Sequence, residues 1–160
     1  MKKPLVAIIM GSASDLPVMN KACDTLKSFG IAHKVVIASA HRTPKLLHDS
    51  VAKFERAGAA VYIAGAGGAA HLPGVIASMT IKPVIGVPIN SKLMGLDSLL
   101  SIAQMPSGVP VAAMAVDGAA NAAIFAAQIL AVGDKSLAKK ITEMREQAAK
   151  KIAESNKALN

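Results

Sequence analysis

Aromatic residues are nearly missing from this chain. They make up 2% of its 160 residues, and tryptophan is absent. The core must therefore be built from Ala, Val, Ile, Leu and Met, whose small side chains let secondary-structure elements approach closely. The same shortage argues against nucleic acid as a partner, because single strands are held largely by stacking on aromatic rings. The net charge of +8 instead favours a small anionic ligand.

Cysteine is almost as scarce, since Cys23 is the only one. A single cysteine excludes a disulfide within the chain and is typical of a reducing compartment, so we expect a cytoplasmic protein. Cys23 lies in an apolar helical pattern, which predicts a buried small hydrophobe and not a nucleophile. The start, Met1-Lys2-Lys3, leads directly into a strand-like run and does not resemble a signal peptide.

Long uninterrupted apolar runs and metal-ligand clusters are also lacking. Asp117 and Gln128 interrupt the Ala-rich stretch 109–132, which argues against a membrane-spanning helix. None of the four histidines pairs with a cysteine at ligand spacing, so we predict no bound metal. His33 and His48 are expected to be surface or packing residues. No nucleophile-elbow sequence supports a serine hydrolase.

Apolar segments and helical patterns alternate along the chain. Strand-like runs are expected at 5–10, 35–38, 60–64, 84–87 and 111–116, each continuous enough for a sheet covered on both faces. Helices are expected at 16–29, 44–57 and 119–131, with shorter ones starting near residues 73 and 97. The alternation predicts a single α/β domain over residues 1–160, with three αβα layers around a five-stranded parallel sheet.

The last segment, 134–160, differs from this α/β core, 1–133. Its apolar residues fall at helical spacing, and Lys and Glu occupy the other face, which predicts an extra amphipathic helix with no strand after it. The pattern alone leaves open whether this helix packs on its own subunit or on a neighbour.

Residues 39–44, with the sequence SAHRTP, form the connection between the second predicted strand and the helix that follows it. Ligands bind at such ends of strands in α/β proteins, and a helix start suits a phosphate. Thr43 and Pro44 are expected to act as N-cap and first helical residue. His41 and Arg42 should therefore be held at the mouth of a site, although an ordinary capped helix would carry the same pattern.

Two further polar or glycine-rich stretches follow strands. In residues 11–15, GSASD, the serines offer hydroxyl and N–H groups to a phosphate, and Asp15 either caps a helix or holds ribose hydroxyls. In residues 65–74, the small side chains predict close approach of the backbone to a ligand, with His71 in the same crevice. The spacing of glycines also mimics a dinucleotide fingerprint, but no carboxylate follows the next strand, which argues against that function.

A sheet order of 2-1-3-4-5 would bring these loops together. The chain then reverses direction between the first and third strands, and the loops at 11–15 and 65–74 flank the crevice. Hydroxyls, Arg42, Asp15 and two imidazoles would surround one cleft. This arrangement is typical of a phosphorylated-ribose site with a histidine placed for proton transfer. A fourth stretch, 104–110, is expected only to be a rigid connector.

Four motifs together resemble the PurE family. They are GSxSD at 11–15, SAHRTP at 39–44, AGAGGAAHLPG at 64–74 and QMPxGxPV at 104–111, in order and over nearly the whole chain. Members of this family are N5-carboxyaminoimidazole ribonucleotide mutases of purine biosynthesis with a flavodoxin-like fold. Residues 95–102 resemble the bacterial mutase branch, whereas the animal-type branch takes free CO2.

The resemblance implies transfer of a carboxylate from an exocyclic nitrogen to C4, with no metal, ATP or organic cofactor. It implies a homo-octamer in which the C-terminal helix makes subunit contacts. His41 would be the acid and base, with His71 as a second catalytic residue. Alternatives are a carboxylase using free CO2 and a non-catalytic nucleotide-binding module. The expected substrate contacts are Ser12, Ser14, Asp15, Ser39, Ala40, Arg42, Gly67, Gly68, Ala69 and Leu72.

Overall fold

Five parallel strands form one sheet in the predicted order, β2-β1-β3-β4-β5. The computed structural model describes residues 5–157 and 159, so the predicted start Met1-Lys2-Lys3, and positions 158 and 160 of the last segment, lie outside the described residues. The strands are β1 (Leu5–Met10), β2 (Ala32–Ile37), β3 (Ala59–Gly67), β4 (Val84–Ile89) and β5 (Ala112–Ala113).

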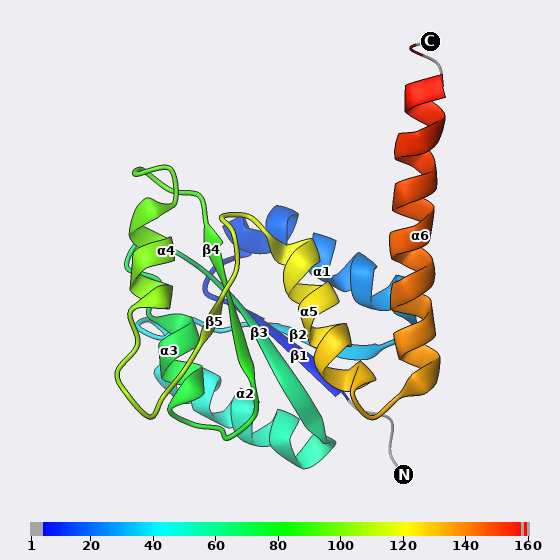
Figure 1. Cartoon of the computed structure of the whole chain (residues 1–160). Coiled ribbons are helices and arrows are strands. Elements are labelled where there is room, and N and C mark those ends of the chain that lie inside the picture. Colours follow the sequence, from blue (N-terminus) through cyan, green and yellow to red (C-terminus); the bar gives the residue numbers. More distant parts are fainter. Residues whose placement is uncertain (1–4, 158, 160) are drawn as a thin grey trace.

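Helices cover both faces of this sheet, which confirms the predicted three-layer α/β architecture (Figure 1). One face packs against α1, α5 and α6, and the other packs against α2, α3 and α4. The helices are α1 (Leu16–Phe29), preceded by the 3-10 turn η1 (Ala13–Asp15), α2 (Pro44–Ala57), α3 (Leu72–Ala77), α4 (Leu96–Ala103), α5 (Ala119–Ala131) and α6 (Lys135–Lys157).

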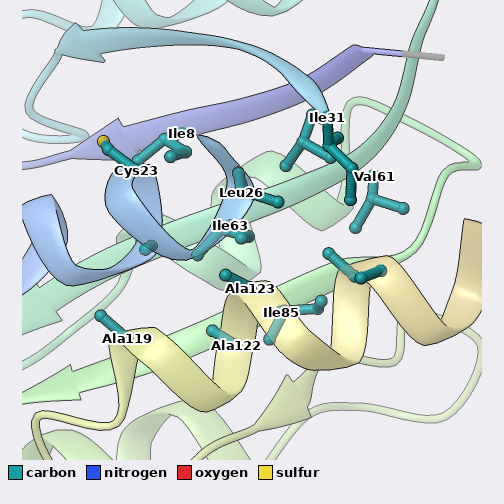
Figure 2. Packing of buried hydrophobic residues seen from close by; sticks show 14 of the residues in the cluster. Ile8, Cys23, Leu26, Ile31, Val61, Ile63, Ile85, Ala119, Ala122 and Ala123 are labelled. Atoms are coloured by element: carbon teal, nitrogen blue, oxygen red, sulfur yellow. The ribbon is translucent and has the colours of Figure 1, made fainter. Parts of the chain in front are cut away.

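Alanine replaces aromatic bulk in the core on the α1 and α5 side. Ala119, Ala122 and Ala123 of α5 are fully buried and lie close to the sheet residues Ile63 and Ile85 (Figure 2). Small side chains there let helix and sheet approach closely, so a dense interior forms without large rings.

Cys23 of α1 belongs to the same cluster, as predicted for a small hydrophobe. Burial raises the pKa of its thiol, which disfavours the nucleophilic thiolate. Within the ranges that the structure describes, no helix is both long and apolar enough to cross a bilayer.

The two edges of the sheet differ from the prediction, since β5 is shorter than expected and β2, which is longer than expected, is partly exposed. The fifth strand was expected over 111–116 but pairs with β4 only at Ala112 and Ala113. Beyond them Asp117 adopts a left-handed conformation, φ +56°, which breaks the extended run. At the other edge Val35 and Ile37 of β2 are 43% and 41% exposed, because both core clusters centre on β1, β3 and β4.

The C-terminal helix α6 has two unlike halves. Leu137 and Ile141 are buried against the α5 side of the core, and the Nζ of Lys140 donates to the Phe29 carbonyl 2.9 Å away. The second half of α6 extends well beyond the rest of the molecule (Figure 1). Ile152, on the same predicted apolar stripe, is 66% exposed. The helix therefore packs on its own subunit only through its first half.

Candidate active site

A cavity of about 560 Å³ lies where β1, β2, β3 and β4 end. Its walls come from four loops, one after each of these strands, as the strand order predicts. Eleven of the twelve predicted site residues line it: His41, His71, Ser12, Ser14, Asp15, Ser39, Ala40, Arg42, Gly67, Ala69 and Leu72. The twelfth, Gly68, does not line the cavity but belongs to the turn after β3, with φ +62°.

The two predicted catalytic histidines touch each other. The Nε2 of His41 lies 2.7 Å from the Nδ1 of His71, with the rings edge to face and their centroids 4.9 Å apart. One of these nitrogens must carry the shared hydrogen and the other must accept it. The pair can therefore hold and exchange a proton at the mouth of the cavity, where both side chains are exposed.

The loop that carries His41 is closed by hydrogen bonds between its own ends. The backbone N–H of Ser39 donates to Thr43 Oγ1 at 2.8 Å, and the Ser39 hydroxyl accepts from the Arg42 N–H at 3.2 Å. Thr43 stands at the N-cap position of α2, but its side chain makes no capping bond. That part of the prediction is wrong, because its hydroxyl is already engaged with Ser39. The result is a tight turn that fixes His41.

Arg42 reaches across the end of the sheet to the neighbouring loop. Its Nη2 donates to the carbonyl oxygen of Gly11 at 3.1 Å. A guanidinium has five N–H donors in a fixed plane, so others are left for an anion after this bond is made. The bond joins the loops after β1 and β2 and holds a permanent positive charge against the cavity.

Asp15 is the buried carboxylate of the cavity, with 8% of its surface exposed. It occupies the N-cap position of α1 without making a side-chain capping bond, so capping does not explain it. The Ser14 hydroxyl donates to its Oδ1 at 3.2 Å. Burial raises the pKa of Asp15, and the bonds from Ser14 and the backbone and the charge of Arg42 only partly oppose this. Asp15 lines the cavity, and its role toward the ribose stays a prediction.

The glycine-rich loop places His71 by a strained turn. Ala70 has φ +41°, a left-handed conformation that is unfavourable for a residue with a Cβ, and its N–H donates to the Gly67 carbonyl at 3.2 Å. Strain of this kind is typical of functional loops. The turn ends at His71, which directly precedes α3.

The sequence interpretation missed the fourth wall of the cavity. Residues 89–91, Ile-Asn-Ser, line it at the end of β4. The signal was available, since Asn90 and Ser91 are polar residues immediately after an apolar strand, as in the other three loops. By contrast, the stretch 104–110 does not line this cavity.

Among the residues that the structure describes, no group of three or more His, Cys, Asp or Glu side chains is arranged to hold a metal ion.

Fold and cleft together define a flavodoxin-like α/β protein with a histidine pair in its ligand site. The sequence model of the AIR carboxylase family matches residues 5–151. A Pyrococcus horikoshii protein named N5-carboxyaminoimidazole ribonucleotide mutase is 54% identical over 159 residues, 99% of this chain and 90% of that protein. A Bacillus subtilis protein of the same name is 50% identical over 98% of this chain and 99% of its own. The chain belongs to the AIR carboxylase family.

Other similar proteins widen this comparison. A Saccharomyces cerevisiae phosphoribosylaminoimidazole carboxylase is 54% identical over 144 residues, 89% of this chain but only 25% of that protein. Crystal structures of a single-residue variant of Treponema denticola PurE2 and of Treponema denticola PurE superpose with TM-scores of 0.92 and 0.90 at 32% and 33% identity. They cover 99% and 98% of this chain and 99% of each of those chains. The resemblance to PurE proteins is thereby confirmed in sequence and in fold.

Proposed function

We propose that this chain is an N5-carboxyaminoimidazole ribonucleotide mutase, an isomerase of purine biosynthesis. It moves a carboxylate from the exocyclic nitrogen of the substrate to C4 of the imidazole ring. The observation that carries this function is the His41–His71 hydrogen bond in a cleft that also holds Arg42 and Asp15. Relatives named for this reaction, 50–56% identical to the chain, support it.

The reaction needs one proton to be moved twice. The carbamate N–C bond breaks when a proton is delivered to that nitrogen, which leaves an amine and CO2. C4 of the ring then attacks CO2, and the C4 proton is removed as the new C–C bond forms. His41 gives the first proton as imidazolium and takes the second as imidazole, so it ends as it began. Positioned proton transfer of this kind contributes about 10²–10⁴-fold.

His71 acts with His41 as the second catalytic residue. The 2.7 Å contact orients the His41 ring and shares its proton. The turn at Ala70 holds His71 in this place. The reaction uses no metal, ATP or organic cofactor, because the leaving and attacking groups need only a proton and a confined CO2.

The remaining site residues divide by chemistry. Arg42 and the start of α2 bind the phosphate, and Ser12, Ser14 and Asp15 bind the phosphate and ribose hydroxyls. Small residues surround the migrating carboxylate and leave room for CO2 beside the ring. These residues, with the larger Leu72, are Ser39, Ala40, Gly67 and Ala69, and Gly68 acts through the turn that places them.

Copies of the chain, assembled as a homo-octamer, are its protein partners. His41 and His71 are exposed on the single chain, whereas a CO2 intermediate must be kept from escaping. Exposed apolar side chains on α6 and on the segment 93–100 give the surface for assembly. The ribonucleotide is the small-molecule partner, neither nucleic acid nor membrane is bound, and the enzyme is cytoplasmic.

A spectrophotometric assay with synthetic carbamate substrate tests this function. We expect turnover with neither ATP nor added bicarbonate. If turnover instead requires free CO2 and the uncarboxylated ribonucleotide, the chain is a direct carboxylase. Tight co-purification of FMN or another nucleotide, without turnover of either substrate, would support a non-catalytic module instead.

A further inference from the structure

Three consecutive residues at the end of β4, Ile89 to Ser91, are held in place by side chains from elsewhere in the chain. The fully buried Ser98 hydroxyl donates to the Ile89 carbonyl at 2.8 Å. The Oδ1 of Asp117 accepts from the Asn90 N–H at 3.0 Å. These bonds come from two different parts of the chain, because Ser98 is in α4 and Asp117 lies between β5 and α5.

Ser91 is the third of these residues, and its partner is Asp97 in the first turn of α4. The Ser91 hydroxyl donates to both carboxylate oxygens, at 3.1 and 3.0 Å. A hydroxyl has one hydrogen and two acceptor lone pairs. Since Asp97 takes the hydrogen, Ser91 can offer only an acceptor to the cavity that it lines.

The residues that follow Ser91 turn away from the cavity, with the Met94 N–H donating to the Ser91 carbonyl at 3.0 Å. Leu93 and Met94 are 63% and 83% exposed. The sheet supports the start of this segment, because β3 pairs with β4 as far as Ile89 and the Asp117 N–H donates to the Pro88 carbonyl at 2.8 Å. The Ser91 side chain lies beyond these paired residues, and Asp97 is the side chain that holds it.

We infer that Ser91 contacts the substrate, as an acceptor for an N–H or O–H donor of the ribonucleotide, and that Asp97 is the positioning residue that sets this polarity. The inference rests on the proposed function for the identity of the ligand. A ribonucleotide of this class has two sources of such a donor, the ribose hydroxyls and the exocyclic amine. Ser91 lies one strand beyond the glycine-rich loop, so it reaches the ligand from the side opposite Arg42.

Substitution of Ser91 tests the contact. We expect Ser91→Ala to raise KM, and to weaken binding of aminoimidazole ribonucleotide, by roughly three- to tenfold, with kcat nearly unchanged. The matched control is Ser101→Ala on α4, whose hydroxyl donates to the Asp97 backbone carbonyl and does not line the cavity. A Ser91→Ala enzyme with wild-type KM and affinity would overturn the inference. If the wild-type enzyme shows no turnover of the carbamate substrate, the proposed function itself is refuted.

Substitution of Asp97 tests the positioning role. Asp97→Asn keeps an acceptor for the Ser91 hydrogen and should retain near-normal KM, whereas Asp97→Ala should raise KM as Ser91→Ala does. The double variant with both alanines should be no worse than Ser91→Ala alone, because the two residues act as a unit. Additive losses would show that Asp97 acts apart from Ser91 and would overturn its assignment. Thermal unfolding of each variant separates this effect from a loss of folded enzyme.

Two ligand analogues identify the donor. If Ser91 accepts from the ribose, its substitution should not affect binding of the 2′,3′-dideoxy analogue, which lacks both ribose hydroxyls. If it accepts from the amine, its substitution should not affect binding of the analogue that lacks the amino group. A loss of affinity that is the same for the parent ribonucleotide and for both analogues would mean that Ser91 supports the wall without touching ligand, and would overturn the contact.

Discussion

The cleft and the core beneath α5 are built by different means. In the cleft, exposed polar side chains are held by hydrogen bonds, such as His41 to His71 and Arg42 to the Gly11 carbonyl. In the core, Ala122 of α5 and Ile141 of α6 are buried in one apolar cluster. The difference implies that substitutions in the cleft should change activity with little effect on stability, and that core substitutions should do the reverse.

The largest effect is expected for His41→Asn in the cleft. The substitution removes the group that carries the proton, so kcat should fall by about 10²–10⁴-fold while the ribonucleotide still binds. Steady-state kinetics and calorimetric titration measure the two quantities. The control is His48→Asn, an exposed histidine of α2 that pairs with Asp49 and does not line the cavity. Near-normal rates for His41→Asn would contradict its role as acid and base.

The converse test is Ile141→Ala in the core. Ile141 is buried between α6 and the α5 side of the sheet, so truncation should lower the free energy of unfolding by about 2–5 kcal/mol. Ile141→Val should cost only about 0.5–1.5 kcal/mol. Urea unfolding measures both, and kcat per folded molecule should stay unchanged. Equal costs for the two variants would show that this part of α6 is not packed as the structure has it.

Local sequence signals predicted most of the fold. The bounds of α1 and α2 follow from helical periodicity and from Gly30 and Gly58, which end them in left-handed conformations with φ +71° and +90°. The short β5 could not be predicted, because six apolar residues in a row do not reveal how many pair with β4. That depends on the turn at Asp117.

The candidate site was predicted as a set of residues but not as a geometry. Strand order brought His41 and His71 to one cleft. Their direct contact depends on two turns, one closed by Thr43 and one strained at Ala70, whose shapes no local pattern determines. The wall at Ser91 could have been predicted from the polar residues after β4, but the orientation of its hydroxyl could not, because that depends on Asp97 in the next helix.

Asp15 shares features of the core and of the cleft, because it is buried like the core residues but lines the cleft. Burial raises the pKa of Asp15 in the folded protein above its value in the unfolded chain. The carboxyl group therefore stabilises the fold at pH values below the unfolded pKa, where it is protonated. This contribution is lost as the pH rises through the folded pKa. Asp15→Asn should therefore be more stable than the wild type at neutral pH, and this difference in the free energy of unfolding should shrink as the pH is lowered.

Ribonucleotide binding to Asp15→Asn should weaken roughly tenfold or more, because a charged acceptor is lost. Urea unfolding across pH, with titration of ligand, measures both; a less stable variant at neutral pH would contradict the burial argument.

Substitution of Ile152 should have the smallest effect on the stability of the single chain. It tests whether the second half of α6 belongs to neither the cleft nor the core and serves instead in subunit contacts. Ile152 continues the stripe of Leu137 and Ile141 but is 66% exposed, so Ile152→Lys removes little packing within the subunit. The circular dichroism spectrum should stay unchanged, whereas sedimentation should show a shift from the proposed octamer toward smaller species, because a charge would be buried at the contact. The control is Glu146→Gln, which raises the net charge by the same amount outside the stripe. If both variants sediment as the wild type does, α6 does not join subunits through this stripe, and the octamer must form through other surfaces.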